Sequence, residues 1–309
     1  MTTKPHKKHL VTHQIVDRSI SLNAYLRENV NLTESTAQFL MSMGAVYINE
    51  IRTDGNPDLN PNDYLRIHHE PKRFPADKIE WKNTVIFENS ELLVIDKPYG
   101  IPVHATLDNN QENVLHCLSE VLKSPLLVTH RLDIGTSGLL VLAKNVRAQR
   151  NINEQFAFKK VRKFYSAVVF KSATKGVTNE LALGFYTHYM KRDPRAPKVL
   201  SREAQFNWKK CDLELVSCQP VSDSLFRVEI ELLTGRSHQI RAQFSLLGSP
   251  ILGDIMYGGD FHPAPDYAGE FYFLSSTRLK IFDFDFIIPF SLRPCVPDTA
   301  LKSLPETLI

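Results

Sequence analysis

A long series of short apolar segments, running from Thr84 to Phe286, is the feature that most constrains the fold of this chain. One of them, from Leu225 to Leu232, partly alternates charged with apolar residues, which is typical of a strand in a sheet with one solvated face. Helices are expected at 146–158 and at 238–247. Many strands with few, irregularly placed helices predict an α+β fold with a central, largely antiparallel mixed β-sheet. The expected strands are residues 85–87, 92–95, 126–128, 139–142, 165–170, 212–216, 225–232, 271–273 and 280–286.

Composition adds limits on compartment and partner. The 309 residues can bury a full core, and the formal net charge of +3 is too small to indicate a nucleic-acid partner by itself. The N-terminus has no apolar signal-peptide core and no apolar run approaches the roughly 20 residues of a membrane span, so we expect a soluble, cytoplasmic protein. Cys117, Cys211, Cys218 and Cys295 form no CxxC pair, and we expect reduced, packed thiols.

The chain divides into four consecutive parts. Residues 1–14 form a basic tail, which is either disordered or an arm that touches phosphate. Residues 15–70 form a small unit with two helices, the second capped by Thr33 and ended by Gly44, followed by short strands at 46–48 and 64–67. A linker rich in charge and proline covers 71–83, and residues 84–309 form the larger domain.

The small unit resembles the S4 RNA-binding domain, through its two helices, short strands and the step Gly-Ala-Val-Tyr-Ile-Asn at 44–49. S4 domains usually carry several Lys and Arg on the second helix, whereas the stretch from Thr33 to Met43 has none. The resemblance therefore implies an S4-like α+β fold and leaves open whether this unit contacts RNA.

The segment His-Arg-Leu-Asp-Ile-Gly-Thr-Ser-Gly-Leu, residues 130–139, is the most informative in the chain. It places Asp133 in a loop between two apolar strands, which is where a rigid sheet commonly presents catalytic groups. Thr136 and Ser137 offer hydrogen bonds for a tight turn. From the residues alone, a structural Asp in a turn and a catalytic Asp are equally good interpretations.

This segment resembles the central motif of the RluA family of pseudouridine synthases. Three further segments match in the same order: LVIDKPYGIPVH at 93–104, KFYSA at 163–167 and LTGRSHQIR at 233–241. Gly-Asp at 253–254 and Tyr-Gly at 257–258 follow, whereas Leu-Ser-Ser at 274–276 stands where the family often has Leu-His-Ala. The resemblance implies the pseudouridine synthase fold for 84–309, RNA as the partner and no cofactor or metal.

The resemblance also assigns roles to residues. Asp133 would be the essential catalytic residue, acting either as a nucleophile or as a base toward the sugar. Arg241 would pair with Asp133 and favour its charged form. Tyr165 would pack against the target base. Four motif residues are candidates for RNA binding or base flipping: His130, Arg131, Arg236 and His238. Lys97 and His104 are interpreted equally well as structural or as functional residues.

Other functions fit the residues less well. The run Gly-Thr-Ser-Gly-Leu at 135–139 fails the Gly-x-Ser-x-Gly pattern of serine hydrolases. A glycoside hydrolase needs a second carboxylate near Asp133, for which Asp254 is a candidate. A non-catalytic RNA-binding protein would not need Asp133, Tyr165 and Arg241 together, and no cluster of metal ligands supports a metalloenzyme. We expect a monomeric isomerase, and the resemblance implies ribosomal RNA as its target, because S4-linked members of the family commonly act there. The alternatives are a transfer RNA pseudouridine synthase and a catalytically idle RNA-binding protein of the same fold.

The predicted RNA partner requires a basic surface. Lys and Arg residues cluster along 144–163 and again in the Pro-containing segment 191–202. Such clusters suit phosphate contacts, which supply most of the sequence-independent affinity for nucleic acid.

Overall fold

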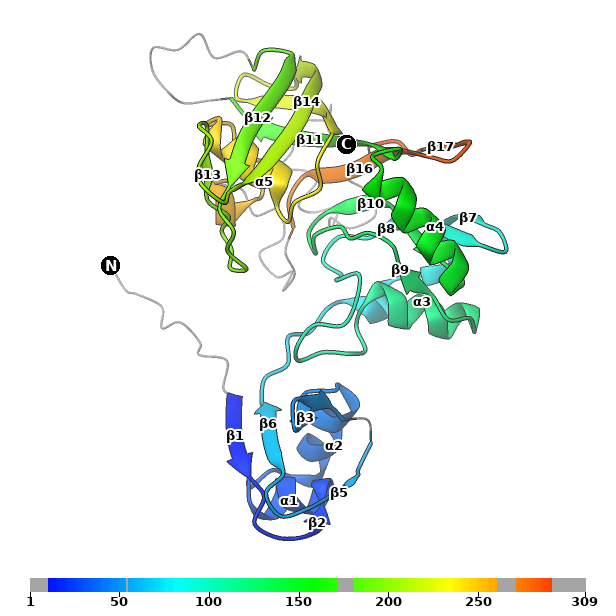
Figure 1. Cartoon of the computed structure of the whole chain (residues 1–309), viewed down its shortest axis with the longest axis vertical. Helices are drawn as coiled ribbons and strands as arrows, with labels where there is room; N and C mark the ends of the chain where they lie inside the picture. The colour runs from blue at the N-terminus through cyan, green and yellow to red at the C-terminus, as the bar shows by residue number, and fades with distance from the viewer. Residues whose placement is uncertain (1–10, 54, 172–180, 260–270, 291–309) are drawn as a thin grey trace.

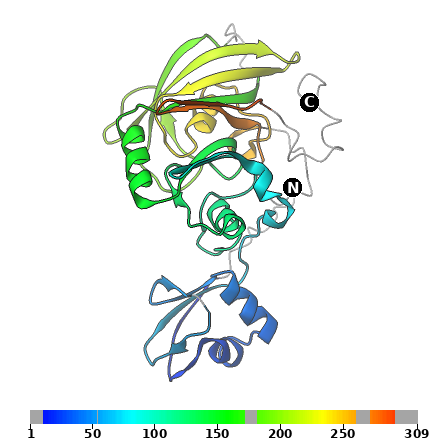
Figure 2. The ribbon, with the colours of Figure 1, turned by 90° about the vertical axis from the view of Figure 1, so that its right-hand side faces the viewer.

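The computed structural model describes residues 11–53, 55–171, 181–259 and 271–290. A small unit lies below a larger body, and a single passage of chain after β6 joins them (Figures 1 and 2). Among the described residues, no helix has both the length and the apolar character that crossing a membrane would demand.

The small unit is a four-stranded antiparallel sheet covered by two helices. The sheet has the order β1-β6-β3-β4, and helices α1 and α2 place Leu22, Leu26 and Leu40 against its inner residues Leu65 and Ile67. The hydroxyls of Ser21 and Thr33 cap the two helices, and the cap at Thr33 is the one that the sequence pattern predicts. The elements are β1 (Val11–Ile15), β2 (Ile20–Ser21), α1 (Leu22–Glu28), α2 (Glu34–Ser42), β3 (Val46–Ile48), β4 (Ile51–Arg52), β5 (Asp58–Leu59) and β6 (Tyr64–His68).

Part of the expected basic tail is a strand instead. Residues 1–10 lie outside the described residues, but residues 11–15 form β1, with Val11 opposite His68 and Ile15 opposite Tyr64. The prediction of a tail through residue 14 was therefore wrong for residues 11–14. The pairing partner lies about 50 residues further along the chain, so no local pattern marks this strand.

The larger body is built on one sheet with the order β13-β12-β14-β15-β11-β16-β10-β8-β7. All its neighbouring strands are antiparallel except β10 and β16, which are parallel where Gly138 meets Ser276. The predicted α+β fold with a largely antiparallel mixed sheet is thereby confirmed. The strands are β7 (Val85–Glu88), β8 (Leu92–Lys97), β9 (Leu127–Val128), β10 (Ser137–Ala143), β11 (Arg162–Phe170), β12 (Gly184–Met190), β13 (Leu200–Ser201), β14 (Lys209–Pro220), β15 (Leu225–Leu232), β16 (Leu274–Ile281) and β17 (Phe284–Ile287).

Few helices accompany this sheet. In the described part of the chain, three are α-helices and three are short 3-10 helices: η1 (Ala76–Lys78), η2 (Trp81–Thr84), α3 (Val114–Leu122), α4 (Val146–Ala157), α5 (Gln239–Leu246) and η3 (Ile255–Tyr257). The two helices predicted in this region correspond to α4 and α5. The strand predicted at 280–286 is in fact the hairpin of β16 and β17, because Phe282 takes a left-handed backbone conformation and turns the chain.

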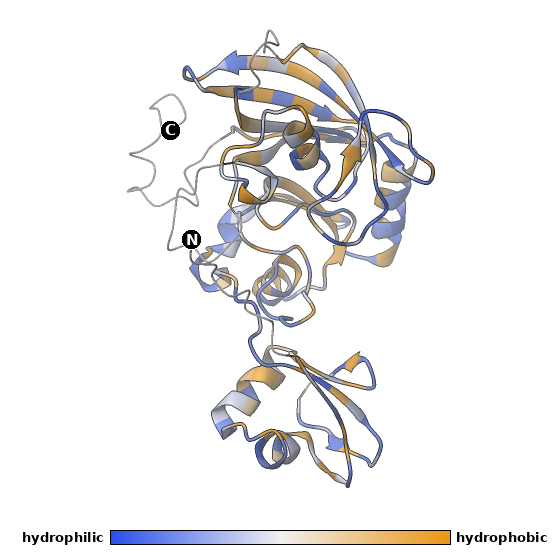
Figure 3. Cartoon of the chain, turned by 90° about the vertical axis from the view of Figure 1, so that its left-hand side faces the viewer, coloured by the Kyte–Doolittle hydropathy of each residue, from blue (hydrophilic) through white to orange (hydrophobic). Residues whose placement is uncertain are grey.

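Strand β10 lies at the centre of the packing. Its residues Leu140 and Leu142 join the core on one face of the sheet, whereas Leu139 and Val141 join a second core on the other. Strands β12 and β14, which lie near the β13 edge of the sheet, alternate between hydrophobic and hydrophilic residues (Figure 3). This is expected for a sheet with one solvated face. The loop that precedes β10 is thus attached to a strand that is buried on both faces.

Candidate active site

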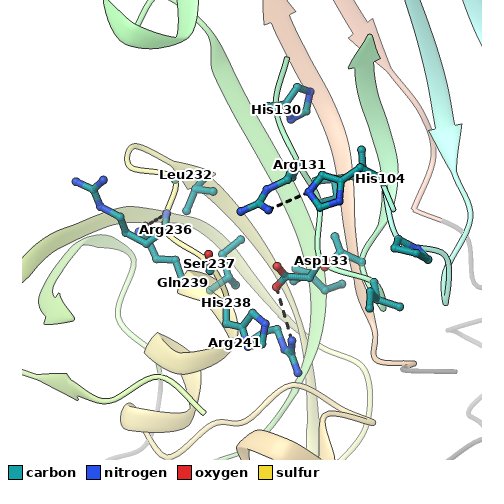
Figure 4. Close-up of a pocket in the computed structure, with 18 of the residues that line it drawn as sticks. His104, His130, Arg131, Asp133, Leu232, Arg236, Ser237, His238, Gln239 and Arg241 are labelled. Carbon is teal, nitrogen blue, oxygen red and sulfur yellow. Dashed lines mark hydrogen bonds and ion pairs between the residues drawn. The ribbon is translucent and has the colours of Figure 1, made fainter. Parts of the chain in front are cut away.

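A pocket of about 810 Å³ opens where the loop before β10 faces the loop that joins β15 to α5. All seven motif residues that the sequence analysis named as catalytic or RNA-contacting candidates line it. These residues are His130, Arg131, Asp133, Tyr165, Arg236, His238 and Arg241. Segments more than a hundred residues apart in sequence therefore meet at one place, as Figure 4 shows.

A buried lysine fixes the loop that carries Asp133. The Nζ of Lys97, at the end of β8, donates to the backbone carbonyls of Pro98 (2.9 Å), Ile134 (3.1 Å) and Thr136 (2.9 Å). Within the loop, the N–H of Thr136 donates to the carbonyl of Asp133 at 3.1 Å and closes a tight turn. The structure thus gives Lys97 a positioning role, one of the two interpretations that the sequence left open.

Asp133 faces a buried guanidinium. Its Oδ2 lies 3.7 Å from Nη1 of Arg241, and the Asp133 side chain keeps 26% of its surface exposed, against 2% for Arg241. The carboxylate can therefore meet a substrate while it stays beside a fixed positive charge. In Figure 4 the two side chains point toward each other across the pocket floor.

The stronger partner of Arg241 is Asp254, a pairing that the sequence analysis did not foresee. Nε and Nη2 of Arg241 donate to the two carboxylate oxygens of Asp254 at 2.7 and 2.9 Å. The guanidinium carbon also lies 4.1 Å from the ring centre of Tyr272 and 5.0 Å from that of Tyr257. This arrangement is bidentate and stacked, so it fixes the guanidinium in position and orientation.

The ionisation of Arg241 follows from these contacts. Burial by itself opposes the charge, but the hydrogen bonds with Asp254 and the nearby negative charges of Asp254 and Asp133 outweigh it and raise the pKa of Arg241. Arg241 is therefore charged at neutral pH. Asp254 is 1% exposed and uses both oxygens on Arg241, which makes it a poor second acid for glycoside hydrolysis.

Tyr165 forms the wall of the pocket from strand β11. The side chain is 6% exposed and packs in the main core, yet it also lines the pocket. Burial, followed by the negative charge of Asp133, raises the pKa of Tyr165 well above its ordinary value. The hydroxyl therefore keeps its proton near neutral pH, and the ring presents a flat apolar surface beside Asp133.

His130 supports the loop with its ring. The backbone N–H of Val141 donates to Nε2 of His130 at 3.0 Å, and the imidazole lies 4.8 Å from the ring of Phe156. Burial, with the charge of Lys163 as a second cause, lowers the pKa of His130 to about 3. The neutral ring is thus engaged in holding the loop to β10, which favours a positioning role over the RNA contact predicted from the sequence.

Three candidates lie at the rim. Arg131 is exposed, and its Nη1 lies 3.1 Å from Nε2 of His104, while the guanidinium of Arg236 points away from Asp133 (Figure 4). His238 precedes α5 in a left-handed conformation, and its Nδ1 lies 3.1 Å from the hydroxyl of Tyr257. Arg131 and Arg236 are therefore available to RNA, whereas His238 also braces the pocket.

The expected basic surface is smaller than the sequence indicates. Lys144 is paired with Glu88, Arg147 with Glu91 and Arg162 with Glu231. Each carboxylate lies at least 56 residues from its cation in the sequence, so the pairing cannot be seen in the run of positive charges. Lys163, in contrast, is half-buried beside the pocket, and burial lowers its pKa.

Comparison with known proteins fits this geometry. The family model described as RNA pseudouridylate synthase matches residues 91–246, which include Asp133, Tyr165 and Arg241. The chain belongs to the RNA pseudouridylate synthase family. The resemblance to its RluA branch, which the motifs carry, is thereby confirmed.

Relatives of this pseudouridylate synthase family member extend the comparison. RNA pseudouridine synthase 6, chloroplastic, of Oryza sativa subsp. japonica is 32% identical over 228 residues, which cover 66% of this chain and 46% of that protein. Ribosomal large subunit pseudouridine synthase D of Pseudomonas aeruginosa is 31% identical over 186 residues, or 59% of this chain and 55% of that protein. The chain thus spans about half the length of these curated relatives.

A solved structure supports the fold. Human RNA Pseudouridylate Synthase Domain Containing 4 superposes with a TM-score of 0.53 over 72% of this chain and 91% of that chain, at 22% sequence identity. At this identity the likeness concerns the fold alone, and it agrees with the mixed, mostly antiparallel sheet described above.

Proposed function

We propose that this protein isomerises uridine to pseudouridine in structured RNA, with Asp133 as the catalytic group and without a cofactor. The observation that carries the proposal is the pairing in the pocket: a partly exposed carboxylate beside a buried guanidinium that a second carboxylate holds rigidly. Fixed charges of this kind stabilise a reacting group without reorganisation during the reaction.

The reaction needs no redox step. The bond between uracil N1 and the sugar breaks, the base turns over, and C5 bonds to the sugar carbon; C5 loses a proton and N1 gains one. Asp133 can act as a nucleophile or take a proton from the sugar, and for either task its carboxylate lies 3.7 Å from the fixed guanidinium of Arg241. Tyr165 would stack on the uracil. Its hydroxyl keeps its proton, and its neutral ring lines the pocket beside Asp133.

We further propose ribosomal RNA as the target. The support is the name of the relative from Pseudomonas aeruginosa, a ribosomal large subunit pseudouridine synthase. The S4-like arrangement of the small unit, with two capped helices on a short sheet, is consistent with a protein that holds structured RNA.

Chemical mapping of pseudouridine tests both proposals together. RNA from cells that lack this protein is incubated with the purified wild type or with Asp133→Asn, and pseudouridine is then located by sequencing. We expect new sites in ribosomal RNA from the wild type alone. New sites confined to transfer RNA would overturn the target, and identical maps from both proteins would overturn the role of Asp133.

A further inference from the structure

A second hollow of about 630 Å³ lies beside the candidate active site, where β11 and β12 begin and β15 ends. The two hollows share a wall, formed by Phe156, Lys163, Leu232, Gly235 and Arg236. At Gly235 this wall carries no side chain, and a Cβ there would lie 3.2 Å from Nζ of Lys163. A chain-like ligand that occupies the first hollow can therefore continue into the second, which we call the flanking hollow.

The flanking hollow is positively charged. Five cations and two carboxylates line it, a difference of +3: Lys159, Arg162, Lys163, Lys210 and Arg236 against Asp212 and Glu231. Both carboxylates are already paired, Glu231 with Arg162 at 2.7 Å and Asp212 with Lys210 at 3.1 Å. Among the described residues, no carboxylate forms an ion pair with the other three cations. This charge suits a phosphate.

The flanking hollow also exposes an aromatic ring. Phe185, on β12, keeps 74% of its surface exposed although it is a large apolar side chain. An exposed ring beside unpaired cations is the combination by which proteins hold single-stranded nucleic acid, because any base can stack on it while the backbone phosphates meet the cations. Nothing in the proposed isomerisation itself requires Phe185.

We propose that the flanking hollow binds a nucleotide next to the target uridine, with its base on Phe185 and its phosphate held by Lys159, Lys163 and Arg236. The inference rests on the proposed function, because it places the target base in the first hollow. It makes Phe185 a residue that holds the RNA strand, outside the group that performs the reaction.

Binding measurements with short RNA test this site. The probes are uridine 5′-monophosphate, which can fill one hollow, and fluorescein-labelled tetrauridylate, which can reach both. The proteins are full-length wild type, Phe185→Ala and the matched control Phe206→Ala, whose ring is 91% exposed but does not line either hollow. We expect Phe185→Ala to weaken tetrauridylate binding about tenfold and Phe206→Ala to leave it unchanged.

A second pair of variants checks the phosphate contact. Lys159 lines the flanking hollow and its exposed neighbour Lys160 does not. Lys159→Gln should reduce the slope of log affinity against log salt by about 0.7, and Lys160→Gln should leave it unchanged. Equal behaviour of Phe185→Ala and Phe206→Ala, or no gain of wild-type affinity from monophosphate to tetranucleotide, would overturn the site.

These outcomes separate the site from the reaction. If the wild type forms pseudouridine but Phe185→Ala binds like the control, the flanking hollow is wrong and the proposed function stands. If tetrauridylate depends on Phe185 but no pseudouridine forms, the flanking hollow stands as an RNA site and the proposed function falls.

Discussion

Arg241 is the residue on which the geometry of the pocket depends. Its guanidinium joins Asp133, which is partly exposed, to Asp254, which is not, and two tyrosine rings cover its faces. Removing one partner of such a buried pair leaves the other charge without compensation, which costs far more than the loss of an exposed pair.

Arg241→Met should therefore cost much more stability than the same change in a surface pair of similar geometry. Arg278 and Asp285 offer that control, because they are also bidentate, at 2.8 and 2.6 Å, but 38% and 36% exposed. We expect urea denaturation to show a loss of about 3 kcal/mol or more for Arg241→Met and a much smaller loss for Arg278→Met. Equal losses would contradict the buried network.

His130 predicts how stability depends on pH. Its pKa is lowered to about 3 in the folded protein, so the unfolded chain binds more protons between that value and about 6.5. Stability that comes from neutral His130 is complete above about pH 6.5 and is lost as the pH falls toward 3. His130→Gln keeps an acceptor for Val141 but does not titrate, so between pH 7 and 4.5 it should lose about 2 kcal/mol less than wild type. Parallel pH profiles from chemical denaturation would refute this.

At the scale of elements, Gly138 decides whether β10 can pair with β16. It has a φ of +101°, and a Cβ there would lie 2.3 Å from the carbonyl oxygen of Ser276 on β16. That parallel pairing sets the loop of Asp133 against the rest of the sheet. The glycine in the Thr-Ser-Gly step of the motif thus has a steric reason, because a side chain at position 138 would collide with the backbone of β16.

Gly138→Ala should be much more harmful than Gly184→Ala. Gly184 also has a positive φ, +127°, but no atom lies within 4 Å of the position of its missing Cβ. The control therefore measures backbone strain alone, about 1 kcal/mol, and Gly138→Ala adds the clash with β16. Thermal unfolding of both variants checks this. A similar fall in the unfolding midpoint for the two would show that β10 and β16 can move apart at Gly138 with no loss of stability.

Elements with local signals were predictable from the sequence, and those fixed by distant partners were not. The cap at Thr33 acts within three residues, so the start of α2 could be placed closely. Strands β1, β2, β4, β5, β12 and β13, most of β16 and helix α3 were missed. The two edge strands β1 and β13 are stabilised by pairing with β6 and β12, which lie elsewhere in the sequence.

The site shows the same division. Asp133, Tyr165 and Arg241 were found because their motifs are long and ordered. The pairing of Arg241 with Asp254 was not found from the sequence, because it is the loop between α5 and η3 that brings Asp254 back to the helix. The flanking hollow has no motif at all, since its walls come from the ends of four strands.

At the scale of the whole molecule, the small unit is fastened to the loop that leads to the pocket. Arg52 donates to the carbonyls of Gly44 and Thr106, and the hydroxyl of Tyr47 donates to the carbonyl of Leu107 at 2.6 Å. The segment after His104, which lines the pocket and contacts Arg131, is thus held from outside the larger body.

Arg52→Ala should loosen that segment. Arg66 is the control, because its guanidinium also covers Tyr47, at 4.3 Å from the ring centre, but it pairs with Glu50 inside the small unit. We expect faster amide hydrogen exchange across residues 104–110 in Arg52→Ala than in Arg66→Ala. Exchange that is unchanged in both variants would mean that the loop is held by the larger body alone.

The central claim is that Asp133 performs an isomerisation that replaces the hydrogen at C5 of uridine. The most direct measurement is release of tritium from RNA labelled at uridine C5, with RNA from cells lacking this protein as substrate and enzyme in excess. The account predicts release by the wild type and none by Asp133→Asn, while both bind the RNA with similar affinity. Release by Asp133→Asn at the wild-type rate, or no release from any RNA by the wild type, would contradict it.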